Sequence, residues 1–167
     1  MTTVLGIDPG TATTGYGVVQ EQDGQLELIA YGVITTPAGQ PLPARLQTIY
    51  RELRALVRKH RPAAGGVEKL FFSKNVRTAM SVGQALGVTL LALADAGLDL
   101  GEYTPLQVKQ AVAGYGGADK RQVQEMVRAL LDLEEVPRPD DAADALAVAI
   151  CHLHSMRLQS ILSHHAV

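Results

Sequence analysis

The apolar residues near the start of the chain occur in short runs that end in turn-forming residues. The run at 4–7 is followed by Asp-Pro-Gly at 8–10, which is typical of a buried strand leading into a turn. The apolar segments at 16–20 and 26–34 flank the turn pair Asp-Gly at 23–24, and they predict two further strands of an antiparallel meander. The chain is therefore expected to open with three consecutive strands.

The rest of the chain alternates between helical and strand patterns. Glycine and apolar residues at 65–70 predict a short buried strand that carries Glu68, and a fifth strand is predicted at 98–103. In the remaining segments, apolar residues recur at helical spacing between capping and helix-breaking residues. We predict helices over 45–60, 76–95, 105–113, 120–131 and 140–158.

This order of elements indicates an α/β fold in which helices flank a five-stranded mixed sheet. The length of 167 residues fits one domain. We assign residues 1–158 to this single domain and residues 159–167 to a C-terminal tail.

Composition and charge narrow the class of protein. Hydrophobic residues make up 47% of the chain and charged residues 19%, which provides for a packed core and argues against a disordered chain. The 15 Lys and Arg residues and 17 Asp and Glu residues give a formal charge of -2. This balance argues against a polybasic protein that bulk charge holds on nucleic acid, although it allows a local basic patch.

The single cysteine and the apolar segments bear on the compartment. With Cys151 alone, neither an intrachain disulfide nor a cysteine zinc cluster can form, and its apolar surroundings predict a buried, inert thiol. The N-terminus lacks the basic and apolar regions of a signal peptide. The longest charge-free stretch, 78–94, is short for a membrane span. We therefore expect a cytoplasmic protein that has no membrane segment.

Four carboxylates occupy unusual positions for ionised side chains. Asp8 ends the first predicted strand, and Glu68 lies in a strand otherwise made of apolar and small residues. Asp141 and Asp144 are three residues apart at the start of the last helix, so they face the same way. If the first and fourth strands are neighbours and the last helix begins over their ends, these four side chains meet at one point.

Such a cluster suits Mg²⁺ or Mn²⁺, because both ions prefer hard oxygen ligands. Two ions about 3.5–4 Å apart can stabilise the attacking and the leaving oxygen of a displacement at phosphorus. Three of the acids also have an ordinary structural interpretation, whereas Glu68 follows a segment that looks buried and is harder to explain in this way. Asp8 can shape an Asx turn, and Asp141 and Asp144 can serve as a helix cap and a solvated acid of the first turn. Spacing alone leaves both interpretations open.

The segment after the first strand has a second functional interpretation. An Asp-x-Gly-Thr turn like that at 8–11 also occurs in actin-like and sugar-kinase ATPases, where it meets a nucleotide phosphate. Those proteins place two such domains around the nucleotide, and this chain has the length of one. It also lacks an obvious later glycine-rich segment for adenosine. A nucleotide binder is therefore kept as the alternative function.

Taken together, these residues resemble the RuvC-type Holliday-junction resolvases of the ribonuclease-H-like superfamily. Four blocks carry the resemblance, and their order and spacing hold from residue 3 to residue 158. The blocks are 6–10 with 15–17, 67–75, 107–128 and 141–147. Four blocks in order make a strong signal, whereas any one of them alone would be weak.

The resemblance implies a ribonuclease-H-like fold and a homodimeric endonuclease that acts on four-way junction DNA in recombination and repair. It implies paired metal-dependent nicks that leave 5′-phosphate ends, with two Mg²⁺ ions per active site and activity with Mn²⁺ as well. Branch-migration motor proteins are implied as further partners. Residue by residue, the metal-binding acids of the family fall on Asp8, Glu68, Asp141 and Asp144.

The resemblance also implies basic and aromatic contacts with DNA. Lys109 and Lys120 fall on basic positions near the scissile phosphate or the DNA backbone, although a helical lysine is usually only a solvated charge. Phe71 falls on an aromatic that meets bases near the junction centre. At Lys69 this chain departs from many relatives, which carry Gln or Glu after the metal-binding Glu.

Further DNA contacts are expected around the two adjacent phenylalanines. Phe71 and Phe72 point in opposite directions in an extended segment, so either can be the exposed ring that stacks on a base. The complete set of expected DNA-binding residues is Phe71, Phe72, Lys74, Arg77, Lys109, Lys120 and Arg121. A module that binds junctions without cutting them would use the same residues, so it is a further alternative.

The long segment at 76–94, which carries no charge beyond Arg77, is either the central core helix or a subunit interface. Gly83 and Gly87 are four residues apart in it and allow the close approach of another helix. The resemblance favours the interface, because a two-fold dimer matches a two-fold substrate.

Overall fold

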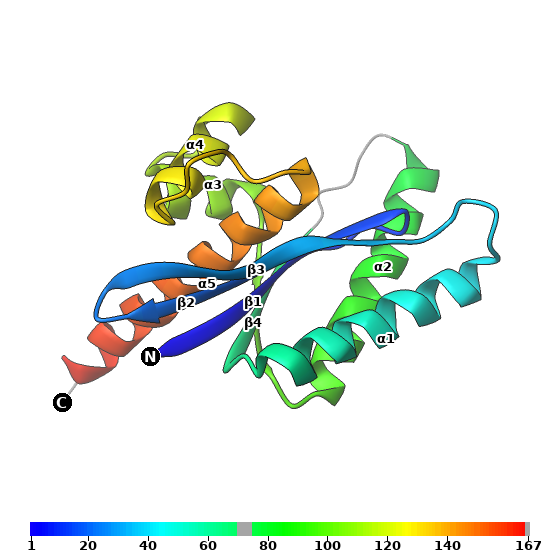
Figure 1. Ribbon diagram of the computed structural model, residues 1–167, viewed down its shortest axis with the longest axis horizontal. Coiled ribbons are helices and arrows are strands. Elements are labelled where there is room, and N and C mark those ends of the chain that lie inside the picture. Colours follow the sequence, from blue (N-terminus) through cyan, green and yellow to red (C-terminus); the bar gives the residue numbers. More distant parts are fainter. Residues whose placement is uncertain (70–74, 166–167) are drawn as a thin grey trace.

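The computed structural model describes residues 1–69 and 75–165 of the chain. The elements follow one another in the predicted order (Figure 1). They are β1 (Thr2–Asp8), β2 (Thr13–Gln22), β3 (Gln25–Thr35), α1 (Leu42–His60), β4 (Ala64–Glu68), α2 (Val76–Asp95), β5 (Asp99–Tyr103), α3 (Pro105–Ala113), α4 (Lys120–Leu130) and α5 (Asp140–His164).

The sheet has the strand order β3-β2-β1-β4-β5. The first three strands pair antiparallel, while β4 and β5 run parallel to β1. Helices α1 and α2 pack on one face of this sheet, and α3, α4 and α5 lie on the other (Figure 1). The prediction of an α/β fold with helices flanking a five-stranded mixed sheet is confirmed.

Helix α5 is the central helix of the core, and glycines in the strands allow it to lie close to the sheet. Its residues from 142 to 153 are buried without a break except at Asp144. A Cβ atom on Gly17 would lie 2.7 Å from Leu146 Cδ2, and one on Gly6 would lie 2.8 Å from the Cβ of Ala149 and collide with the helix backbone. Any larger residue at these positions would push α5 away from the strands.

Helix α2 is not the central core helix. It packs beside α1 and buries only four residues of its 20 fully, which are Ala85, Thr89, Ala92 and Leu93. A Cβ atom on Gly83 or Gly87 would have nothing within 4 Å among the described residues, so these two glycines face outward. The interpretation of this helix as a subunit interface stays a prediction.

Two helices among the described residues, α2 and α5, are long and apolar enough to cross a membrane by length and composition alone. The charge-free stretch at 78–94 is part of α2, which has 20 residues and is therefore longer than that stretch. In this structure α5 packs against the sheet and α2 packs beside α1.

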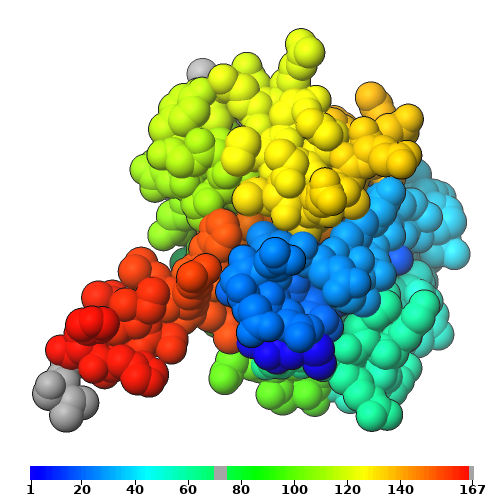
Figure 2. Space-filling view, turned by 60° about the vertical axis from the view of Figure 1, so that its left-hand side comes forward, coloured from blue at the N-terminus to red at the C-terminus, as the bar shows by residue number. Residues whose placement is uncertain are grey.

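The last helix extends beyond its predicted end at Leu158 and continues to His164. Neither glycine nor proline follows Cys151, so the sequence contains no strong signal that would stop the helix earlier. Residues 157–164 are exposed, and they project from the body of the molecule (Figure 2). The division into a domain over 1–158 and a tail stays a prediction.

Candidate active site

Four carboxylates meet where β1, β4 and α5 end or begin. Asp8 is the last residue of β1 and Glu68 is the last residue of β4. These strands are parallel neighbours in which Ile7 pairs with Val67, so their final residues lie side by side. Asp141 and Asp144 come from the start of α5. The backbone of Gly15 in β2 packs directly against that of Asp141, which brings the start of this helix close to the sheet.

The carboxylates are close enough to act on one group. Asp8, Asp141 and Asp144 each offer an oxygen atom, and these atoms all lie within 4.8 Å of one another. The carboxyl group of Asp8 is hydrogen-bonded to that of Glu68. The structure therefore brings together the four acids that the sequence singled out, and together they could hold a metal ion.

Crowding of like charges changes how these acids ionise. Burial, followed by the charge of Glu68, raises the pKa of Asp8 to about 9. Burial is also the largest cause that raises the pKa of Glu68 and of Asp144. Asp8 thus keeps its proton at neutral pH and donates it in the hydrogen bond to Glu68. A bound cation would remove the need for that proton.

Two lysines lie beside the acids. Lys109 and Lys120 line a cleft of about 240 Å³ together with Glu68 and Asp144. Lys120 Nζ is 3.5 Å from an oxygen of Asp144, and the charges of both lysines oppose the rise in the pKa of Glu68. The structure therefore places both predicted basic residues at the edge of the acidic cluster.

The helices that carry these lysines have well-defined starts. Thr104 and Gln107 form a capping box at the start of α3, and Asp119 and Gln122 form another at the start of α4. Each box satisfies backbone N–H groups that the first turn of a helix leaves unpaired. Lys120 is the first residue of α4, so its backbone position depends directly on the second box.

Hydrogen bonds fix the loop that follows Asp8. The hydroxyl of Thr11 donates to the carbonyl oxygen of Ser81 over 2.8 Å, and the hydroxyl of Ser81 donates to that of Thr11 over 2.9 Å. The hydroxyl of Thr36 donates to the carbonyl oxygen of Thr11 over 2.5 Å. This loop is thereby attached to α2. Sequence reasoning missed this role, for which the threonines at 11, 13 and 14 were the only signal.

The remaining predicted DNA contacts fall into two groups. Arg77 is exposed near the start of α2, and Arg121 is exposed in the first turn of α4. Phe71, Phe72 and Lys74 lie outside the described residues. Their predicted contacts with DNA stay predictions.

The prediction for Cys151 agrees with the structure. Its thiol is buried, and burial raises its pKa to about 12, so it stays protonated and unreactive at neutral pH. The neighbouring His152 is also buried, and its Nδ1 atom lies 2.6 Å from the hydroxyl of Tyr103. His152 packs against Gly66 and Gly101 of the sheet, whereas the thiol of Cys151 lies 3.9 Å from the carbonyl oxygen of Gln107 in α3.

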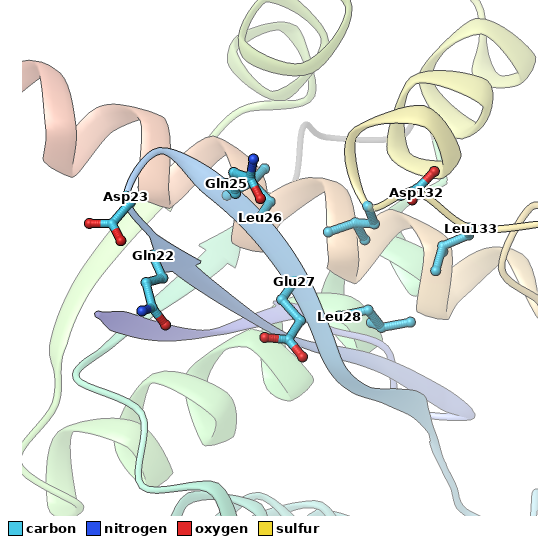
Figure 3. Close-up of a pocket in the computed structure, with 9 residues that line it drawn as sticks. Gln22, Asp23, Gln25, Leu26, Glu27, Leu28, Asp132 and Leu133 are labelled. Atoms are coloured by element: carbon cyan, nitrogen blue, oxygen red, sulfur yellow. The ribbon is translucent and has the colours of Figure 1, made fainter.

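A larger hollow lies elsewhere on the molecule. It measures about 830 Å³ and lies between the β2–β3 hairpin and the residues that follow α4 (Figure 3). Asp23, Glu27 and Asp132 line it beside several leucines. None of the four clustered acids lines this hollow, so its size does not identify it as the reactive site.

Comparison with known protein families gives a match over most of the chain. The family model described as crossover junction endodeoxyribonuclease RuvC matches residues 4–152. A crossover junction endodeoxyribonuclease RuvC from Chloroflexus aurantiacus is 64% identical over 151 residues, covering 90% of this chain and 92% of that protein. One from Syntrophomonas wolfei is 58% identical over 159 residues, covering 95% of this chain and 92% of that protein.

Solved structures agree with this match. RuvC of Thermus thermophilus in complex with a Holliday junction substrate superposes with a TM-score of 0.91 at 39% identity, covering 95% of this chain and 97% of that one. The yeast mitochondrial Holliday junction resolvase Ydc2 shares the fold, with a TM-score of 0.67 at 19% identity over 97% of this chain and 82% of its own. The predicted ribonuclease-H-like fold is confirmed, and the chain belongs to the RuvC family of crossover junction endodeoxyribonucleases.

Proposed function

We propose that this protein is a metal-dependent endonuclease that resolves four-way DNA junctions by paired nicks and leaves 5′-phosphate ends. The observation that carries the proposal is the meeting of Asp8, Glu68, Asp141 and Asp144 at one end of the sheet. The family match and the likeness to a RuvC in complex with a Holliday junction support four-way DNA as the substrate. Such an activity belongs to recombination and repair in the cytoplasm.

The donor set fits a divalent cation. All four side chains offer carboxylate oxygens, which are the ligands that Mg²⁺ and Mn²⁺ prefer. Burial, together with the charges of the neighbouring acids, raises the pKa of Asp8 so that it retains a proton, and this indicates that the cluster lacks positive charge. We infer that the four acids hold Mg²⁺, with two ions in each site and Mn²⁺ as a substitute. Bound metal supplies Lewis acidity at phosphorus and lowers the pKa of water.

The lysines of the cleft contribute positive charge without metal. Lys109 and Lys120 reach the edge of the acidic cluster from two different helices. A phosphate approaching the carboxylates must overcome their repulsion, and the two ammonium groups reduce it. We assign Lys120 to the charge that develops on the phosphate during cleavage, and Lys109 to the phosphate or the adjacent backbone.

The wider DNA surface extends from this cleft. We assign backbone contacts to Lys74, Arg77 and Arg121, and base contacts to Phe71 or Phe72. Phosphate contacts give affinity and register, whereas an aromatic wedge suits the unpaired step at the centre of a junction.

Paired nicks require two active sites, and we propose a homodimer formed through α2. A stripe of exposed small and apolar residues runs along this helix at helical spacing. It consists of Val76, Met80, Gly83, Gly87 and Leu91. An isologous dimer would place two sites around a substrate of the same symmetry. Branch-migration motor proteins remain proposed partners on the family resemblance alone.

Removing one carboxylate tests the metal site. We expect Asp8→Asn and Asp144→Asn to reduce cleavage of a synthetic four-way junction at least about a thousandfold, because metal binding supplies several kcal/mol of charge stabilisation. Junction binding, measured by gel shift in Ca²⁺ or without metal, should stay within about threefold of the wild type. Each protein is incubated with four-way and linear DNA in Mg²⁺, Mn²⁺ or EDTA, and products are resolved by gel.

Asp99→Asn is the matched control, because Asp99 is an exposed acid at the start of β5, at the end of that strand away from the cluster. It should cleave at the wild-type rate. Wild-type cleavage by Asp8→Asn would show that the metal-site assignment is wrong. Structure-selective binding by the wild type with no cutting in either metal would indicate a binding module. ATP hydrolysis without junction cleavage would indicate a nucleotide-dependent enzyme.

A further inference from the structure

One carboxylate outside the acidic cluster connects α4, which carries Lys120, with α5, which carries two of the clustered acids. Asp140 is the first residue of α5 and immediately precedes Asp141. Its Oδ2 atom lies 3.2 Å from Lys120 Nζ, and its Oδ1 atom accepts a hydrogen bond of 3.1 Å from Gln124 Nε2. The two oxygens of one side chain are thus engaged by two residues of α4.

The spacing of the two partners makes this contact directional. Lys120 and Gln124 are four residues apart, so they lie on the same face of α4, one turn from each other. A single ion pair between long side chains leaves the lysine free to swing, whereas the second bond from Gln124 fixes where the carboxylate of Asp140 is held. Lys120 Nζ then lies between Asp140 and Asp144, at 3.2 and 3.5 Å.

The charges around Lys120 indicate what this contact would do once metal is bound. Asp144 is the only other acid with an ion pair to Lys120 among the described residues. In the proposed function Asp144 is committed to the metal, so its pull on the ammonium group weakens. Asp140 points to α4 instead and stays available to hold Lys120 at the edge of the cleft.

We propose that Asp140 is a positioning residue for the cleavage reaction, which holds Lys120 toward the scissile phosphate and aligns α4 with α5 through Gln124. This inference rests on the proposed function and on the role assigned there to Lys120. It adds to that function a residue that touches neither metal nor DNA and acts through the lysine.

Single-turnover cleavage of a four-way junction in Mg²⁺ tests the proposal. Asp140→Asn should lower the cleavage rate about twofold to fivefold, the range expected for the loss of one exposed ion pair, and leave the dissociation constant for the junction within twofold. Gln124→Ala, which leaves every acid in place, should lower the rate to a smaller extent. Lys120→Ala should lower the rate at least tenfold.

A double-mutant cycle separates positioning from general destabilisation. In the Lys120→Ala background, Asp140→Asn and Gln124→Ala should have no further effect, because the side chain that they position is gone. Glu125→Gln is the control variant. It removes one negative charge from α4, the helix of Lys120 and Gln124, but leaves the cleft unchanged, because Glu125 pairs with Arg128. It should cut at the wild-type rate.

Three results would contradict a positioning role for Asp140. The inference is overturned if Asp140→Asn cuts at the wild-type rate, if its effect persists in the Lys120→Ala background, or if Glu125→Gln reproduces it. A wild-type protein that leaves four-way junctions intact in both metals would instead overturn the proposed function itself. The two failures are therefore distinguishable within one set of assays.

Discussion

At the scale of single residues, the acidic cluster depends on a proton that the folded chain retains. Asp8 and Glu68 end neighbouring strands, and the carboxyl groups share one hydrogen bond because both cannot be ionised at low cost in a half-buried site. In the unfolded chain the same two groups lie in water and ionise independently. The cluster therefore lowers the stability of the metal-free protein at neutral pH and favours cation binding.

This proton makes the stability of the metal-free protein depend on pH. Unfolded Asp8 ionises near the ordinary pKa of 3.8, whereas folded Asp8 retains its proton to about pH 9. The unfolded state thus binds fewer protons in this range, and stability falls as the pH rises toward 9. We expect the thermal midpoint in EDTA to fall steadily between pH 7 and pH 9, as measured by calorimetry.

Asp8→Asn is the direct comparison for this measurement, because the amide does not titrate. Its midpoint should change much less over the same interval, and Mg²⁺ should raise the wild-type midpoint more at pH 9 than at pH 7. The interval lies above the range in which His152 contributes, since burial lowers the pKa of that imidazole from 6.5. Equal slopes for the two proteins would contradict the assigned pKa of Asp8.

At the scale of elements, the position of α5 is set by what the strands beneath it lack. Gly6 in β1 and Gly15 and Gly17 in β2 leave room for the helix backbone and for Leu146. Because α5 lies directly on the strands, its first turn reaches the ends of β1 and β4, where Asp8 and Glu68 lie. The glycines thereby determine how far Asp141 and Asp144 are from the other two acids.

A methyl group in this contact should separate the helix from the sheet. We expect Gly6→Ala to lower the free energy of unfolding by about 3 kcal/mol, because its Cβ would meet helix backbone, which cannot move without shifting α5. Urea denaturation measures the loss. Calorimetric titration should also show weaker Mg²⁺ binding, since the acids of α5 would move with the helix.

Gly39→Ala is the matched control, because a Cβ on Gly39 has open space around it among the described residues. Its stability should equal or slightly exceed that of the wild type, as is usual where alanine fits the backbone. Gly65→Ala should lie between the two, since the tightest contacts of its Cβ would be with the side chains of Leu100 and Leu93, at 3.1 and 3.4 Å, and the nearest backbone atom, Leu5 O, is 3.7 Å away. Equal stability of Gly6→Ala and Gly39→Ala would contradict the assigned role of the glycines.

The order of elements could be predicted from the sequence, because periodic apolar residues and local capping signals carry it. The capping residues Thr104 and Asp119, for example, mark the starts of α3 and α4 as predicted. The end of α5 at His164 could not be predicted, since no stop signal marks it. The glycines under α5 were also missed as packing residues, because only the three-dimensional contact shows what each one faces.

In the candidate site, too, some residues could be predicted from the sequence and others could not. Asp8, Glu68, Asp141 and Asp144 could be chosen because acids are rare at strand ends and in buried segments. Asp140 could not be chosen, since an exposed acid at a helix start usually interacts only with the helix dipole. Its partners on α4 become neighbours only through tertiary packing, so the sequence contains no local signal for the contact.

At the scale of the whole molecule, the stripe on α2 exposes apolar side chains that no other described part of the same chain covers. Met80 is 63% exposed and Leu91 is 54% exposed, and the two outward glycines lie between them. Burying this stripe against a second copy would remove apolar surface from water and allow close helix packing. The loop that follows Asp8 is hydrogen-bonded to Ser81 of the same helix, so this loop connects the proposed interface to the acidic cluster.

A charge in the stripe should therefore dissociate the dimer. We expect Met80→Glu to raise the dimer dissociation constant at least tenfold in sedimentation velocity, because two carboxylates would be buried at a two-fold interface. On a supercoiled plasmid with an extruded cruciform, it should give mostly nicked circles, whereas the wild type gives linear products. Linear products require both nicks within one binding event.

Leu158→Glu places the same charge at a similarly exposed leucine, 57% exposed, on the projecting part of α5. It should keep the mass and the linear products of the wild type. If Met80→Glu formed dimers with the same dissociation constant as the wild type, α2 would be excluded as the interface.

The length of α5 has a practical consequence for experiments on this protein. Twenty residues separate Asp144 from His164 at the end of the helix, which amounts to about 30 Å along its axis. Met1 lies near the same end of the molecule, where it lines a hollow with Arg157 and Ile161. A fluorophore or surface anchor attached there would be far from the carboxylates. Single-molecule recordings of junction cleavage could thus be made without obstructing the approach of DNA.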